Sequence, residues 1–169
     1  MDAKVLIERL ERNGTVLHSL MAGLGPEEIT WKPAPGSWSI LEICAHLLDE
    51  EREDFRTRLL IALTEQGTKW PPIDPQGWVK ARAYAERDFE ETLGTFVFER
   101  TVSIGRLHEL TSADWDTAYD HPRGPLRAGD LLAAWVAHDL LHLRQITHRL
   151  WQYTGVMSSP FHSTYAGDW

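Results

Sequence analysis

The sequence predicts an all-α protein built as a four-helix bundle in a single domain that spans residues 1–169. Three observations predict this fold. Apolar residues recur every three or four positions over four long segments, no segment alternates convincingly between apolar and polar residues, and Gly and Pro gather between the segments. With 169 residues, 43% of them hydrophobic, the chain is long enough to bury a core as one domain.

The first helix is predicted over about residues 4–23. Its apolar residues keep helical spacing and are Leu6, Leu10, Leu17, Leu20 and Leu24. Gly23, Gly25 and Pro26 end this helix. Residues 27–37 carry two prolines and a glycine, so we expect them to follow an extended or turning path.

The second helix is predicted to begin after Ser39 and to run to about residue 63, before Gly67. Ser39 and Glu42 have the spacing of a capping box, in which each side chain satisfies a backbone N–H of the first turn. The apolar side of this helix includes Ile40, Cys44, Leu47, Leu48, Phe55 and Leu59. His46 lies one helical face over, and its spacing does not say which other helix it faces.

The rest of the chain is predicted to hold two more long helices. Residues 66–77 are rich in Pro and Gly and form an ordered crossing loop, because Trp70 and Trp78 lie at its margins. Apolar spacing predicts the third helix over 79–110, and a polar connector follows over 111–125. The fourth helix is predicted over Asp130 to Trp151, and an aromatic tail follows that packs onto its own domain or onto a partner.

The fourth helix carries two histidines one turn apart, His138 and His142, on its apolar stripe. The stripe consists of Leu131, Trp135, His138, His142 and Ile146. Residues four apart lie about 6 Å apart along a helix, so two imidazoles on that spacing can converge on one ion. The spacing leaves two interpretations open, a metal site and a pair of buried structural histidines.

Charge and cysteine content narrow the function classes. The formal net charge is −8 and no basic patch occurs, which argues against nucleic acid as a partner. Cys44 is the only cysteine, so no intrachain disulfide is expected, and core packing is favoured over metal ligation for this residue. We expect a cytoplasmic protein that does not associate with membranes, since the chain has neither a signal-peptide pattern at its start nor an apolar run long enough to span a bilayer.

Two segments resemble the signature regions of the DinB-like (DinB/YfiT) superfamily. They are residues 35–51, PGSWSILEICAHLLDEE, and residues 131–146, LLAAWVAHDLLHLRQI. The resemblance implies a four-helix bundle with a long crossover connection. It also implies that one histidine of the second helix and two of the fourth hold a divalent metal ion, usually zinc or nickel. The matching positions are His46, His138 and His142.

Four further residues are candidates to surround this site. Asp49 and Glu50, one turn from His46, are expected either to accept the free imidazole N–H or to be solvated charges. Gln145, one turn beyond His142, is expected to bond a ligand or to satisfy a buried polar contact. His162 in the tail could fold over the site as a proton shuttle, although a solvated position is favoured.

Three functions remain open at this stage, and no catalytic residue is assigned. The leading hypothesis is a metal-dependent enzyme resembling the S-transferases of low-molecular-weight thiols such as bacillithiol or mycothiol, with a small molecule as substrate. The alternatives are a metal-dependent hydrolase, and a non-catalytic metal-binding bundle that acts through association. A homodimer is compatible with all three. Three histidines leave a position open for water or substrate, which favours an open site over a structural one.

Overall fold

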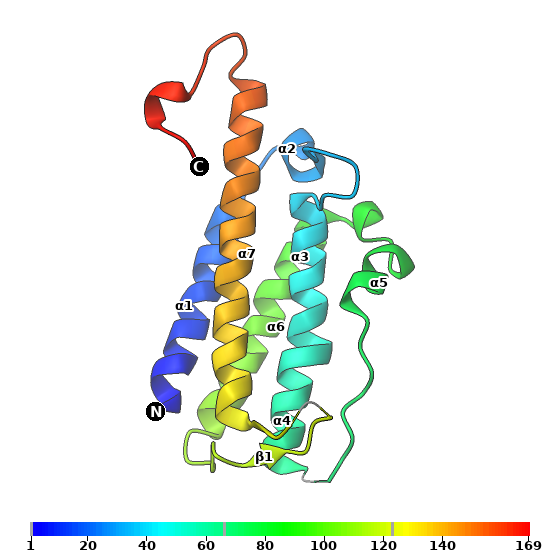
Figure 1. Cartoon of the computed structure of the whole chain (residues 1–169), viewed down its shortest axis with the longest axis vertical. Coiled ribbons are helices and arrows are strands. Elements are labelled where there is room, and N and C mark those ends of the chain that lie inside the picture. The colour runs from blue at the N-terminus through cyan, green and yellow to red at the C-terminus, as the bar shows by residue number, and fades with distance from the viewer. Residues whose placement is uncertain (1, 66, 123) are drawn as a thin grey trace.

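The computed structural model describes residues 2–65, 67–122 and 124–169 and shows a four-helix bundle, which confirms the predicted fold class (Figure 1). The long helical segments are α1 (Ala3–Met21), α3 (Ile40–Asp49) with its continuation through η1 (Glu50–Phe55) into α4 (Arg56–Thr64), α6 (Phe89–Glu109) and α7 (Ala128–Met157). Each of α1 and α3 contacts both α6 and α7.

The directions in which the bundle helices run explain the long crossover connection. In Figure 1, α1 and α7 ascend, whereas α3 with α4, and then α6, descend. Because α4 and α6 are consecutive bundle helices that run the same way, the chain must return along the length of the bundle between them. That return carries α5 (Pro75–Ala81) and the 3₁₀ turn η2 (Tyr84–Glu86). The long crossover connection is therefore confirmed.

The second bundle helix begins as predicted. The backbone N–H of Glu42 donates to Ser39 Oγ at 3.3 Å, and the N–H of Ser39 donates to Glu42 Oε2 at 2.8 Å, which completes the capping box. The six residues of η1 form a π-helix that the apolar spacing does not predict. Such π segments inside α-helices are frequent at functional sites. This one begins four residues after His46.

The third predicted helix, 79–110, is wrong in its first third. The chain forms α5 and η2, and α6 begins only at Phe89. Ala83 takes a left-handed backbone conformation with φ 47°, which breaks the helix, and Asp88 starts a new one by accepting the N–H of Glu91 at 2.8 Å. Tyr84 anchors the break, because its hydroxyl donates to Asp49 Oδ2 at 2.7 Å.

Two predicted connectors contain short regular elements. The predicted connector 27–37 contains most of the short helix α2 (Pro26–Thr30), whose first residue is a proline, at a position where no N–H partner is needed. Within the connector 111–125 and just beyond it, β1 (Ala118–Tyr119) pairs antiparallel with β2 (Leu126–Arg127). Strands of two residues are too short to show an alternating pattern.

The last helix is longer than predicted at both ends. It begins two residues earlier, where the N–H of Arg127 donates to Asp130 Oδ2 at 3.2 Å. It continues past Trp151 to Met157, because the exposed final turns tolerate Gly155. The tail holds the 3₁₀ turn η3 (Thr164–Ala166) and folds back onto α7, where Trp169 stacks on His148 with ring centroids 5.1 Å apart.

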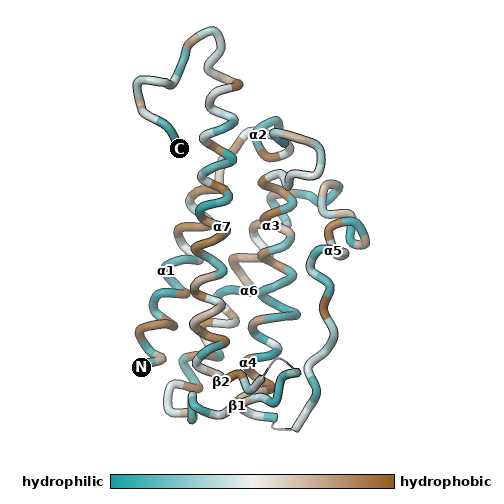
Figure 2. Tube along the Cα trace, viewed as in Figure 1, coloured by the Kyte–Doolittle hydropathy of each residue, from teal (hydrophilic) through white to brown (hydrophobic). Residues whose placement is uncertain are grey.

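Apolar and polar residues alternate along the bundle helices at helical spacing (Figure 2). The buried apolar side chains form two large clusters. One surrounds the α3 end of the bundle, with Leu17, Ile43, Phe96 and Ile146, and the other surrounds the α4 end, with Leu10, Leu59, Leu132 and Trp135. No helix in the described part of the chain is both long and apolar enough to cross a membrane.

A single buried arginine connects all four bundle segments. Arg100 of α6 donates to both oxygens of Glu51 in η1, at 3.0 and 3.1 Å from Nε, and to both oxygens of Asp139 in α7, at 2.7 and 2.9 Å. It also donates to the carbonyl of Leu10 in α1 at 3.0 Å. Glu51 and Asp139 each lie close in sequence to a histidine predicted to bind metal, so this network fixes how the helices that carry these histidines meet.

Candidate metal centre

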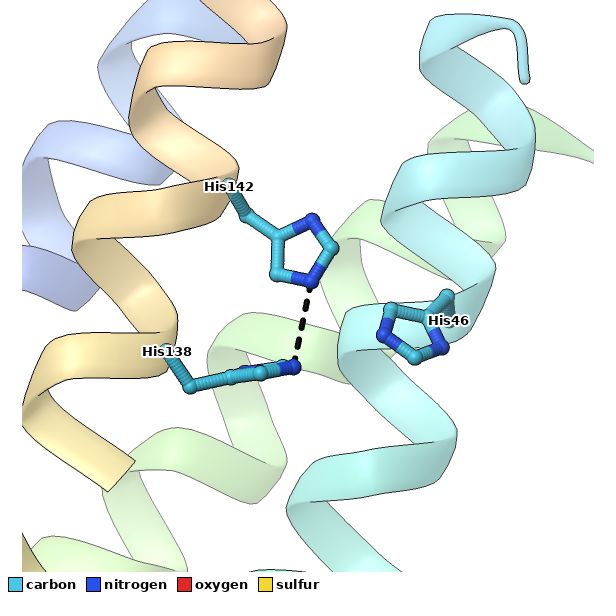
Figure 3. Close-up of side chains that lie close together, drawn as sticks. All are labelled: His46, His138 and His142. Atoms are coloured by element: carbon cyan, nitrogen blue, oxygen red, sulfur yellow. Dashed lines mark hydrogen bonds between the residues drawn. The ribbon is translucent and has the colours of Figure 1, made fainter. Parts of the chain in front are cut away.

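Three histidines from two helices converge inside the bundle (Figure 3). His46 comes from α3, whereas His138 and His142 come from α7. Ring nitrogens of the three side chains all lie within 4.8 Å of one another. The structure therefore brings together the three residues that the sequence predicts as ligands.

The helix geometry accounts for this convergence. The i, i+4 spacing of His138 and His142 puts both rings on the side of α7 that contacts α3, and His46 lies on the facing side of α3. Phe55 packs against the ring of His138 with centroids 4.9 Å apart, and Trp38 packs against His46 at 4.9 Å. Phe55 therefore limits the movement of the His138 ring, and Trp38 limits that of the His46 ring.

The hydrogen bonds of His142 define which of its nitrogens is available. Its Nδ1 lies 2.8 Å from Gln145 Oε1, an acceptor, so Nδ1 carries the proton and Nε2 has a free lone pair. This Nε2 lies 3.1 Å from His138 Nε2. Two nitrogens that bind one ion at about 2.0–2.1 Å are expected about 2.8–3.4 Å apart in octahedral or tetrahedral geometry, so the pair fits a shared ion.

The third imidazole completes the set from the other helix. His46 is only 5% exposed, and its Nδ1 is a buried polar atom without a hydrogen-bond partner. In Figure 3 one nitrogen of this ring faces His138 and His142, while the other faces away. A metal ion held by the cluster would bind the nitrogen that faces His138 and His142.

All three imidazoles are held neutral, which is the form that binds metal. Burial, reinforced by the neighbouring His142, lowers the pKa of His46 to about 3. Burial likewise lowers the pKa of His138 to about 3, with His142 and His46 adding to the effect. Burial also lowers the pKa of His142, against the opposing hydrogen bond of Gln145. No proton therefore competes with a cation near neutral pH.

The two predicted acidic neighbours are engaged elsewhere. Asp49 Oδ2 accepts the hydroxyl of Tyr84 and pairs with Arg82 at 2.9 Å and Arg87 at 3.2 Å, so it clamps the crossover segment onto α3. Glu50 is buried and interacts with Asp54; burial first, and then that neighbour, raises the pKa of Glu50 to about 8. Within the described residues, neither carboxylate forms a hydrogen bond with a histidine of the cluster.

Of the remaining candidate residues, Gln145 belongs to the site, whereas His162 and Cys44 do not. Gln145 does join the site, through its bond to His142. His162 is exposed in the tail and does not belong to the cluster found among the described residues. Cys44 is fully buried in the core, and burial raises the pKa of its thiol to about 12, which agrees with the predicted packing role.

Sequence reasoning missed two parts of this region. The first is the buried pairing of Asp139 with Arg100; its signal is an arginine on the apolar stripe of α6, between Phe96 and Ile104. The second is the mouth of the site. An open hollow reaches the cluster from the surface, and its lining residues are Gly36, Trp38, His46, Gln76, His142 and Gln145.

Two proteins are similar to this chain in sequence. Two relatives from Oceanobacillus iheyensis are named "Putative metal-dependent hydrolase OB0782" and "Putative metal-dependent hydrolase OB0413". The first is 24% identical over 143 residues, which is 83% of this chain and 81% of the relative. The second is 25% identical over 149 residues, which is 86% of this chain and 83% of the relative.

One solved structure shares the fold. It is YfiT from Bacillus subtilis, described as "a probable metal-dependent hydrolase with an unusual four-helix bundle topology". The superposition has a TM-score of 0.78 at 19% identity and covers 89% of this chain and 87% of YfiT. Residues 9–146 match the sequence profile of the DinB superfamily, so the resemblance predicted from the two signature segments is confirmed, and this chain belongs to the DinB superfamily.

Proposed function

We propose that this protein is a metal-dependent hydrolase of small molecules in which His46, His138 and His142 hold one divalent ion. The observation that carries the proposal is the convergence of three neutral, buried imidazoles within 4.8 Å of one another. Imidazole nitrogen suits zinc and nickel, which we propose as the natural metals.

The number of ligands supports a reactive site over a structural one. Structural zinc sites have four protein ligands, whereas catalytic sites have three and keep a position for water or substrate. Among the described residues, the cluster contains three such side chains and no fourth. A divalent ion held by these three histidines would lower the pKa of a bound water and would polarise a substrate, which is the chemistry that hydrolysis needs.

The residues of the chain supply orientation and access. Gln145 keeps the proton of His142 on Nδ1, so that Nε2 stays available. The Arg100 network holds α7 against η1 and α6, and thereby fixes the position of His138. Trp38 and Gln76 line the hollow through which a substrate would approach.

The names of the relatives support hydrolysis ahead of the other predicted activities. Transfer of a low-molecular-weight thiol would use the same open position. A purely associative role would not require the neutral, converging imidazoles.

The test is turnover by zinc-loaded and nickel-loaded protein on a panel of carboxylic esters, amides and phosphoesters. We expect hydrolysis that is lost in His142→Ala and retained in His148→Ala, a matched histidine of α7 outside the cluster. Equal rates in the wild type and His142→Ala would overturn the proposal. A parallel assay supplies a low-molecular-weight thiol with an electrophile; turnover only in that assay would assign thiol transfer instead.

A further inference from the structure

Arg149 of α7 is a buried cation without a buried anion. It is 8% exposed, its Nη1 donates to Gln152 Oε1 at 2.7 Å, and its Nε is buried with no hydrogen-bond partner. Among the residues that the structure describes, no carboxylate forms an ion pair with it. Arg100 shows the usual arrangement, because that buried arginine meets two carboxylates.

Such an arrangement is costly for the protein alone. An arginine keeps its charge in proteins, and burying a charge without a counter-charge is strongly unfavourable. Burial lowers the pKa of Arg149, and no neighbouring charge opposes that effect. A guanidinium recognises carboxylate and phosphate groups through paired hydrogen bonds, so an anionic ligand would satisfy both the charge and the free Nε–H.

The position of Arg149 relates it to the histidine cluster. It follows His142 by seven residues, which places it on the same face of α7, roughly 10 Å further along the axis. Gln145 lies between them on this face; its oxygen accepts from His142, which leaves its amide nitrogen as a donor. His142 and Gln145 line the hollow from α7, and Arg149 follows Gln145 by one helical turn.

We propose that Arg149 is the anion-recognition residue of this site, and that the substrate carries a carboxylate or phosphate group roughly 10 Å from its reacting atoms. This inference rests on the proposed function, which places the reacting atoms of the substrate at the histidine cluster. The face of α7 would then bind one molecule at two points, with His142 at the reacting end and Arg149 at the anionic end.

A series of alkyl hydroxamates tests the inference in the zinc-loaded protein by calorimetry. The hydroxamate group binds an open zinc position, and the far end of a linker of increasing length carries a carboxylate, a phosphate or a neutral carboxamide. At the best linker length we expect an anionic end to improve affinity by about tenfold to a hundredfold over the carboxamide. This gain should vanish in Arg149→Gln and persist in Arg144→Gln, a matched exposed arginine of α7.

A second measurement needs no metal. We compare the thermal midpoint of metal-free protein in phosphate and in chloride at equal ionic strength. Phosphate should raise the midpoint of the wild type by binding the native state, and should not raise that of Arg149→Met. In chloride, Arg149→Met should be at least as stable as the wild type, since it removes an uncompensated charge. A clear loss of stability would show that Arg149 is structural and would overturn the inference.

The outcomes separate the two proposals. If the neutral hydroxamate binds the zinc-loaded protein but the anionic end adds nothing, the inference fails and the proposed function stands. If the anionic gain persists in Arg149→Gln, the inference also fails. If no hydroxamate binds, yet phosphate stabilises the metal-free wild type only when Arg149 is present, the anion site stands and the open metal site fails.

Discussion

Replacing Arg100 with Met should destabilise the fold far more than an ordinary surface substitution. The guanidinium is the shared partner of Glu51 and Asp139, whose side chains are both 0% exposed. Without it, two carboxylates remain buried in the bundle with no cation. Removing one partner of a buried ion pair costs about 3–5 kcal/mol, which corresponds to a fall of roughly 10 °C in the thermal midpoint for a domain of this size.

Urea unfolding of metal-free protein measures this cost. Glu51→Gln should be milder, at about 1–3 kcal/mol, because the remaining pair of Arg100 and Asp139 is electrically balanced. The control is Arg106→Met, on the same helix, whose side chain is 62% exposed and should change the free energy of unfolding by no more than about 0.5 kcal/mol. An Arg100→Met variant that loses less than Glu51→Gln would refute the view that the arginine holds the helices together.

Three further predictions concern residues around the site. Gln145→Leu removes the acceptor that fixes the Nδ1 proton of His142, so zinc affinity measured by calorimetry should fall about 10–100-fold, and an unchanged affinity would count against this role. Folded Glu50 keeps its proton up to a pKa of about 8, whereas the unfolded residue loses it near 4.5, so the wild type loses stability as the pH rises between these values. The stability of Glu50→Gln relative to the wild type should therefore grow from about pH 5 to about pH 8 in urea unfolding, and a constant difference would refute the shift. Cys44, fully buried with its pKa raised to about 12, should react with a thiol reagent only after urea unfolds the chain; labelling of native protein at the rate of a free thiol would contradict this.

Local sequence signals predicted most of the fold. The Ser39 and Glu42 capping box fixed the start of α3, and apolar spacing identified the bundle helices. The break between α5 and α6 could not be predicted in this way, because Tyr84 and Phe89 continue the apolar spacing across it. A long-range contact imposes the break, namely the hydrogen bond from Tyr84 to Asp49, and a single sequence does not reveal such a partner.

The candidate site shows the same division. His138 and His142 could be predicted as a pair because both belong to one helix, whereas His46 was joined to them only through the family resemblance. Asp139 carried no signal of its own, since its partner Arg100 lies in another helix and their pairing depends on how the bundle assembles. The uncompensated charge of Arg149 likewise became visible only once its surroundings were known.

The central claim is that three histidines from two helices bind one divalent ion. A calorimetric titration of metal-free protein with zinc tests it most directly, with His46→Ala as the decisive variant because His46 is the member of the cluster that comes from α3. We predict that the wild type binds one equivalent of zinc per chain. His46→Ala should bind zinc at least about a hundredfold more weakly, whereas His148→Ala should bind it with the affinity of the wild type. Equal affinities in the wild type and His46→Ala would contradict the three-histidine site.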